Sequence, residues 1–112
     1  MTDTNRLDAF IADSMKHNKE EASIIRKLFT ACKAAGDPIV SVWDGEDDNP
    51  VSTLKSINTQ AFNLDQCHLY TKSGGWVFIV MGNGWDAISD YTTSLDPIID
   101  PVLDWVASHD DY

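Results

Sequence analysis

Apolar residues recur at helical spacing at the start of the chain. Leu7, Phe10, Ile11 and Met15 lie three or four positions apart, which predicts a helix with one apolar face. A hydroxyl side chain favours the first position of a helix, so we expect this one to be capped near Thr4.

A second helical pattern follows the break at His17-Asn18. Asn18 and Glu21 have the spacing of a capping box, which predicts that a new helix begins there. Gly36-Asp37-Pro38 is a typical stop signal and predicts its end. The residues expected to form its buried stripe are Ile25, Leu28, Phe29 and Cys32.

The middle of the chain changes from helical to extended patterning. Ile39–Trp43 is a short run of mostly β-branched residues and predicts the first strand, followed by an acidic turn over residues 44–50. Asn49 followed by Pro50 is typical of a helix start, so we expect a helix there. Because this stretch is rich in Ser, Thr and Asn, a strand over part of it stays as an alternative. Its apolar positions are Val51, Leu54, Ile57 and Ala61.

Three further strands are predicted to form a meander. The runs Cys67–Lys72, Trp76–Met81 and Trp85–Thr92 are separated by glycine-rich turns at Ser73-Gly74-Gly75 and Gly82-Asn83-Gly84. The second turn contains Asn-Gly, which favours a tight hairpin. Because Trp76–Met81 is apolar on both faces, we expect it to be the central strand and to be covered by helices on at least one side.

The last helix is expected to begin at one of two Asp-Pro units, Asp96-Pro97 or Asp100-Pro101, with the Asp as its cap. Its inward positions are Ile98, Ile99, Val102, Leu103 and Val106. The whole pattern predicts a single α+β domain over residues 1–112. It consists of N-terminal helices, an antiparallel sheet of three to four strands and a C-terminal helix packed on that sheet.

Charge is distributed very unevenly along the 112 residues, whose net charge is −10. Residues 1–36 carry a net charge of +1, whereas residues 37–112 carry two basic and thirteen acidic side chains, a net charge of −11. Such a surface repels phosphate, so we expect no direct binding to nucleic acid or to a membrane. Two cysteines form no framework of disulfides, and no leader or membrane-spanning run is evident, so we expect a cytoplasmic protein.

No catalytic or metal-binding motif stands out, and we expect no cofactor, no metal and no enzymatic activity. The run Asp44–Asp48 does not fit a calcium loop, because Asn49 and Lys55 occupy positions that require Gly and Glu. The three histidines lack ligand spacing. Cys67 and His68 are neighbours in a predicted strand and should point to opposite faces.

Asp86 and Asp90 would lie roughly 13 Å apart in a straight strand, too far for paired carboxylate chemistry. A metal-dependent hydrolase that uses Asp44, Glu46, Asp86 and Asp90 stays as an alternative. A structural or self-assembling accessory protein is a second alternative.

Tryptophan and aspartate residues supply the candidate binding surface. Trp43 and Trp76 occupy apolar strand positions and are expected in the core, whereas Trp85 and Trp105 are flanked by Asp and should be partly exposed. Asp96, Asp100 and Asp104 recur along one helical face. Two explanations for this pattern stay open, namely capping of the helix and a role in binding. The candidate partner-binding residues are Asp44, Glu46, Asp47, Asp48, Trp85, Asp86, Asp90, Asp96, Asp100, Asp104 and Trp105.

Three segments within residues 40–105 carry a family resemblance: 42–46 (VWDGE), 75–80 (GWVFIV) and 82–92 (GNGWDAISDYT). With them the chain resembles small acidic proteins encoded by phages, prophages and mobile elements. That resemblance implies an accessory role similar to DNA mimics or inhibitors of host defence. The predicted function is therefore non-enzymatic binding, as a monomer or homodimer, to a protein with a basic nucleic-acid-binding surface.

Overall fold

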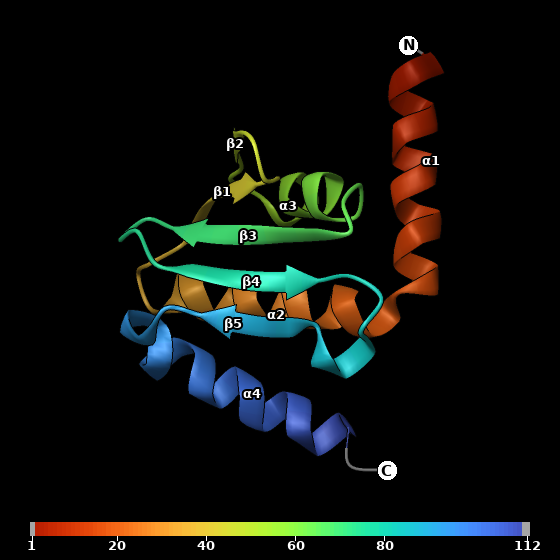
Figure 1. Ribbon diagram of the computed structural model, residues 1–112. Helices are drawn as coiled ribbons and strands as arrows, with labels where there is room; N and C mark the ends of the chain where they lie inside the picture. Colours follow the sequence, from red (N-terminus) through yellow and green to blue (C-terminus); the bar gives the residue numbers. More distant parts are fainter. Residues whose placement is uncertain (1, 111–112) are drawn as a thin grey trace.

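The structure, a computed structural model, describes residues 2–110, and the side chains of residues 7–109 (Figure 1). Four α-helices, five strands and two 3-10 turns follow one another in this described part. In chain order they are α1 (Thr2–His17), α2 (Lys19–Ala34), β1 (Ile39–Trp43), β2 (Asp48–Pro50), α3 (Leu54–Ala61), β3 (Gln66–Thr71), β4 (Trp76–Val80), η1 (Gly84–Asp86), β5 (Ile88–Tyr91), η2 (Thr93–Leu95) and α4 (Asp96–Asp110). This confirms the predicted α+β class.

The five strands form one antiparallel sheet in the order β2-β1-β3-β4-β5. The sheet is wider than predicted because residues 48–50 pair with β1 as a short edge strand instead of starting a helix. Helix α3 begins later, at Leu54. There the side-chain oxygens of Thr53 and Ser56 each accept a hydrogen bond from the backbone amide of the other residue, which forms a capping box.

One face of the sheet forms the hydrophobic core with the helices. Alternate strand positions are buried against α2, α3 and α4, including Val42, Leu69 and Ile79, each with 0% exposure. Helix α2 lies behind the sheet in Figure 1. β4 is an interior strand that helices cover on one face, as predicted, although the middle position of the sheet belongs to β3.

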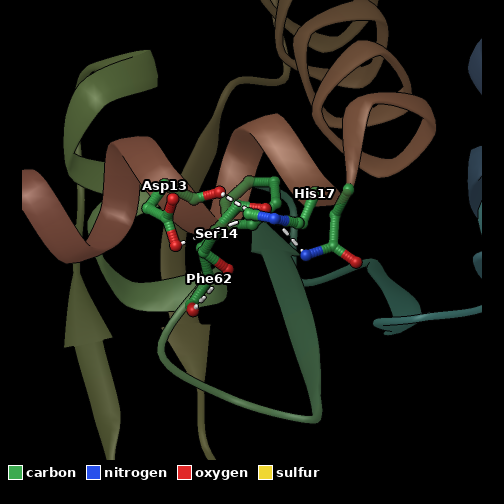
Figure 2. A network of polar contacts seen from close by, with 5 residues as sticks. Asp13, Ser14, His17 and Phe62 are labelled. Carbon is green, nitrogen blue, oxygen red and sulfur yellow. Dashed lines mark hydrogen bonds and ion pairs between the residues drawn. The ribbon is translucent and has the colours of Figure 1, made fainter.

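The break between the first two helices lies at Asn18, as predicted, but the capping box does not form. The Asn18 side chain gives α2 no capping bond; instead, its Nδ2 donates to the Ser14 carbonyl at 2.7 Å. The Ser14 hydroxyl donates to the carbonyl of Phe62 at 3.5 Å and joins α1 to the end of α3 (Figure 2). Of the predicted apolar face of α1, Ile11 is buried, whereas Phe10 is 54% exposed.

Glu21, the expected partner in that capping box, is buried and serves a distant turn. Its Oε2 accepts hydrogen bonds from the amide of Gly82 at 2.7 Å and from the amide of Gly84 at 3.2 Å. Both glycines have positive φ angles, whereas Asn83 has a φ of −92°. The Gly82-Asn83-Gly84 segment is therefore not the expected tight Asn-Gly hairpin, but a wider loop folded around a carboxylate.

The predicted third strand of the meander is shortened by this loop. Trp85 and Asp86 belong to η1, and β5 begins only at Ile88. Helix α4 begins at the first Asp-Pro unit. Because η2 leads directly into α4, Asp96 already has helical backbone angles and is the first residue of the helix. The prediction that Asp96 is the N-cap residue, which precedes the helix, was therefore wrong. Within residues 2–110, no helix has the length and apolarity required to cross a membrane.

Candidate functional site

Three aromatic rings form a row across the sheet face opposite the helices. Trp43 pairs with His68 across β1 and β3, and His68 pairs with Phe78 across β3 and β4. The His68 and Phe78 rings stack with centroids 4.6 Å apart and an interplanar angle of 16°, and Trp43 meets His68 edge to face at 5.2 Å. Strand pairing thus fixes the three rings side by side.

Two more rings extend this row toward the other end of the strands. Tyr70 pairs with Trp76, and the Trp76 ring meets His68 edge to face at 5.1 Å. All five rings are half-buried. Within residues 2–110, no helix lies in front of strands β3 and β4, on the side of the sheet opposite α2 (Figure 1). We call this surface the aromatic face, and its members are Trp43, His68, Tyr70, Trp76 and Phe78.

The prediction that Trp43 and Trp76 belong to the core was wrong. In each strand the neighbouring valine, Val42 or Val77, points to the helices, so alternation turns the indole to the opposite face. The signal that could have revealed the aromatic face is the alternation itself. In β3 and β4 the aromatic and imidazole side chains occupy one phase, whereas Cys67, Leu69, Val77 and Ile79 occupy the other.

Carboxylates lie at both edges of the aromatic face. Asp48 on edge strand β2 is the partner of Trp43, and Asp90 on the opposite edge strand β5 is the partner of Phe78. Both aspartates are exposed. The row across the sheet therefore runs from one acid through three rings to another acid.

The β1–β2 turn extends this acidic edge. The Oδ1 atom of Asp44 accepts hydrogen bonds from the amides of Glu46 at 2.9 Å and Asp47 at 2.8 Å. These amides, that of Asp47 first, hold the pKa of Asp44 below its usual value. Glu46, Asp47 and Asp48 are exposed. A cavity of about 70 Å³ lies between the turn and the aromatic face. It is lined by Trp43, Asp44, Gly45, Gln66, His68 and Phe78.

The other candidate residues lie on a second surface, formed by η1 and α4. Trp85 and Trp105 meet edge to face at 5.6 Å, and both are half-buried as predicted. Asp100 and Asp104 are exposed on α4. Burial, together with the carboxylates of Asp100 and Asp96, raises the pKa of Tyr91. The structure thus divides the predicted site into two surfaces, of which only the first adjoins the aromatic face.

The four carboxylates of the hydrolase alternative are not brought together. Asp44 and Glu46 follow β1, whereas Asp86 and Asp90 flank or belong to β5, three strand spacings away, which corresponds to roughly 14 Å. Within the described residues, no three His, Cys, Asp or Glu side chains are placed to hold a metal ion.

The two thiols are buried on the core side of the fold. Burial raises the pKa of Cys32 to about 11 and that of Cys67 to about 12. Both groups therefore stay protonated at neutral pH. Cys67 and His68 point to opposite faces, as predicted.

His68 makes the aromatic face sensitive to pH. Burial among the rings lowers the pKa of His68 below its usual value of 6.5, while Asp90 opposes that shift. The unfolded chain therefore takes up this proton at a higher pH than the folded protein. The stability that neutral His68 contributes is complete above pH 6.5 and is lost as the pH falls through the lower folded pKa.

We accordingly expect the melting temperature to fall between pH 7 and pH 5, and to fall less in His68→Gln. Parallel thermal melts of the two proteins at each pH measure the difference. Identical pH profiles would show that His68 does not titrate differently in the folded and unfolded states.

Comparison with known proteins finds no matching family model, no similar curated sequence and no matching solved structure.

Proposed function

We propose that this protein is a non-enzymatic binding protein that holds a basic segment of a partner protein on its aromatic face. The observation that carries this proposal is the row Asp48–Trp43–His68–Phe78–Asp90, in which half-buried rings lie between exposed carboxylates. Arginine and lysine side chains bind both kinds of group. They lie over aromatic rings through cation–π attraction and form charge-assisted hydrogen bonds with carboxylates.

The charge of the surrounding surface supports a basic partner. Within the described chain, none of the five strands contains a Lys or Arg that would compete for these groups. The exposed acids of the β1–β2 turn extend the negative potential beyond the sheet edge. Such a field accelerates association with a basic surface and rejects an acidic one.

A nucleic-acid-binding protein is the partner that this chemistry favours, because its Arg and Lys residues are arranged to meet phosphates. The carboxylates would occupy the places of phosphates, and the protein would inhibit its partner by competition. The resemblance to small acidic phage and mobile-element proteins supports the same proposal, with a host or defence protein as the target.

The test begins with capture of the partner from the native host and identification of the bound protein. Its affinity is then measured at several salt concentrations for two triple variants that remove equal charge. The face variant is Glu46→Gln/Asp48→Asn/Asp90→Asn. The control is Asp8→Asn/Asp13→Asn/Glu20→Gln, whose residues lie on α1 and α2 and are not candidate partner-binding residues. Asp44 is left intact because it holds the turn together.

We expect the face variant to lose about tenfold or more in affinity and to show a flatter salt dependence, while the control stays within about twofold of the parent. Duplex DNA should compete for the same partner. Equal losses in both variants would attribute binding to net charge and contradict the proposed site. A partner without a basic surface, or one that DNA does not displace, would contradict DNA mimicry.

A further inference from the structure

A groove lies on the helical side of the molecule, away from the aromatic face. It consists of two adjoining cavities of about 430 and 400 Å³ that share Met15, Leu54 and Asn58 in their walls. Helices α1, α2 and α3 supply most of its lining, and Trp105 of α4 closes one side. We call it the helical groove. Cavities of this size are typical of small-molecule sites.

The two parts of the groove differ in character. The part between α1 and α3 is largely apolar, with Ile11, Ala12, Met15 and Leu54 in its wall. The part over α2 contains the cationic side chains of Arg26 and Lys27. Because both residues line the same cavity, positive charge is concentrated at one end of an apolar channel.

Neither of these cations is neutralised by the protein itself. Within the described residues, no carboxylate oxygen lies within 4.0 Å of Arg26 or Lys27, although the chain carries 18 acidic residues. Lys27 lies over the Trp105 ring, with its Nζ atom 5.4 Å from the ring centre. By contrast, Lys55 at the other end of the groove has Asp8 at 4.0 Å.

Asn58 gives the groove a polar group where its two parts meet. The residue is 7% exposed, and among the described residues its Oδ1 atom has no hydrogen-bond partner. Burying an amide oxygen without a partner is unfavourable, and such atoms are uncommon in folded proteins. This oxygen is closed off from solvent, so the part of Asn58 that can reach the groove is its Nδ2 group, a hydrogen-bond donor.

We propose that the helical groove binds an anionic amphiphile, a small molecule with one carboxylate or phosphate group and a hydrocarbon body. The anion lies against Arg26 and Lys27 and accepts a hydrogen bond from Nδ2 of Asn58. The hydrocarbon lies along the wall formed by Ile11, Met15 and Leu54. A single pair of adjacent cations suits one anionic group better than the repeated carboxylates of an acidic peptide. This site is independent of the proposed partner-binding face.

The test uses decanoate, titrated into the full chain below its micellar concentration and followed by calorimetry and by ¹H–¹⁵N NMR. We expect saturable binding at one site, with shifts of the Asn58 side-chain amide and of the Trp105 indole. Decyl phosphate distinguishes a phosphate head group from a carboxylate. Decyltrimethylammonium, which has the same tail and the opposite charge, should not bind in the groove. Binding of the cationic probe there, or no saturable binding of either anion, would overturn the proposal.

Two variants locate the site on the protein. Arg26→Gln/Lys27→Gln should weaken decanoate binding by about tenfold, whereas Lys16→Gln/Lys19→Gln, with the same charge change outside the groove, should leave it unchanged. Asn58→Leu should keep the fold, because it replaces a buried unpaired amide with an apolar side chain of similar size, and should still weaken binding. An acidic peptide that binds more tightly than decanoate, or equal losses in both double variants, would contradict an amphiphile site.

Discussion

Ile79→Ala is expected to lower the free energy of unfolding by about 2 to 5 kcal/mol. Ile79 has 0% exposure and lies on interior strand β4, between Cys67 of β3 and Ile88 of β5. Truncation at this position removes apolar contacts with the helices and leaves a cavity that the two neighbouring strands prevent from closing.

Phe78→Ala provides the matched control, because Phe78 precedes Ile79 in the same strand and points to the aromatic face. Although it removes more atoms, we expect a smaller loss, since its ring is only half-buried. Urea unfolding of both variants, with the slope compared to the parent, measures the difference. If Phe78→Ala lowers the free energy of unfolding as much as Ile79→Ala or more, the aromatic face is buried in the folded protein and is not an open surface.

Glu21→Ala is expected to lower the free energy of unfolding by about 2 to 3 kcal/mol, an unusually large effect for a change at a charged residue. The carboxylate accepts hydrogen bonds from the backbone amides of Gly82 and Gly84. It thereby joins the first turn of α2 to the loop between β4 and β5. Its removal leaves both amides without an acceptor. The positive end of the α2 dipole also loses its buried anion.

Two neighbouring variants separate this role from general effects on the helix. Glu20→Ala changes an adjacent acid in the same turn of α2, and we expect it to cost less than about 1 kcal/mol. Glu21→Gln keeps an oxygen acceptor, so its loss in the free energy of unfolding should lie between those of Glu20→Ala and Glu21→Ala. Amide hydrogen exchange at Gly82 and Gly84 should accelerate in Glu21→Ala. Unchanged exchange there would contradict a role for the carboxylate in holding the loop.

The β4–β5 loop shows where local sequence rules reach their limit. Its Gly-Asn-Gly motif correctly predicts a turn, because only glycine adopts the positive φ angles at residues 82 and 84 without strain. Although the chain after residue 36 is strongly acidic, this turn holds a carboxylate, that of the protein's own Glu21. Its contribution depends on a contact across 61 residues, which no local pattern contains.

Local periodicity and composition are sufficient to predict several features of this protein. These include the break at Asn18, the end of α2 just before Gly36, strands β1, β3 and β4, the start of α4 at one of two Asp-Pro units, and the concentration of acid after residue 36. Each is set by neighbours a few positions apart, because backbone angles and helical or strand spacing are local properties.

Other features follow from tertiary packing: which phase of each strand faces the helices, and which residues meet across the sheet. Tertiary packing placed Trp43 and Trp76 on the aromatic face and set Asp48 and Asp90 at its two edges. It also brought Arg26 and Asn58 to one groove. These arrangements depend on strand register and helix packing between residues far apart in the chain, where the burial of one face requires the exposure of the other.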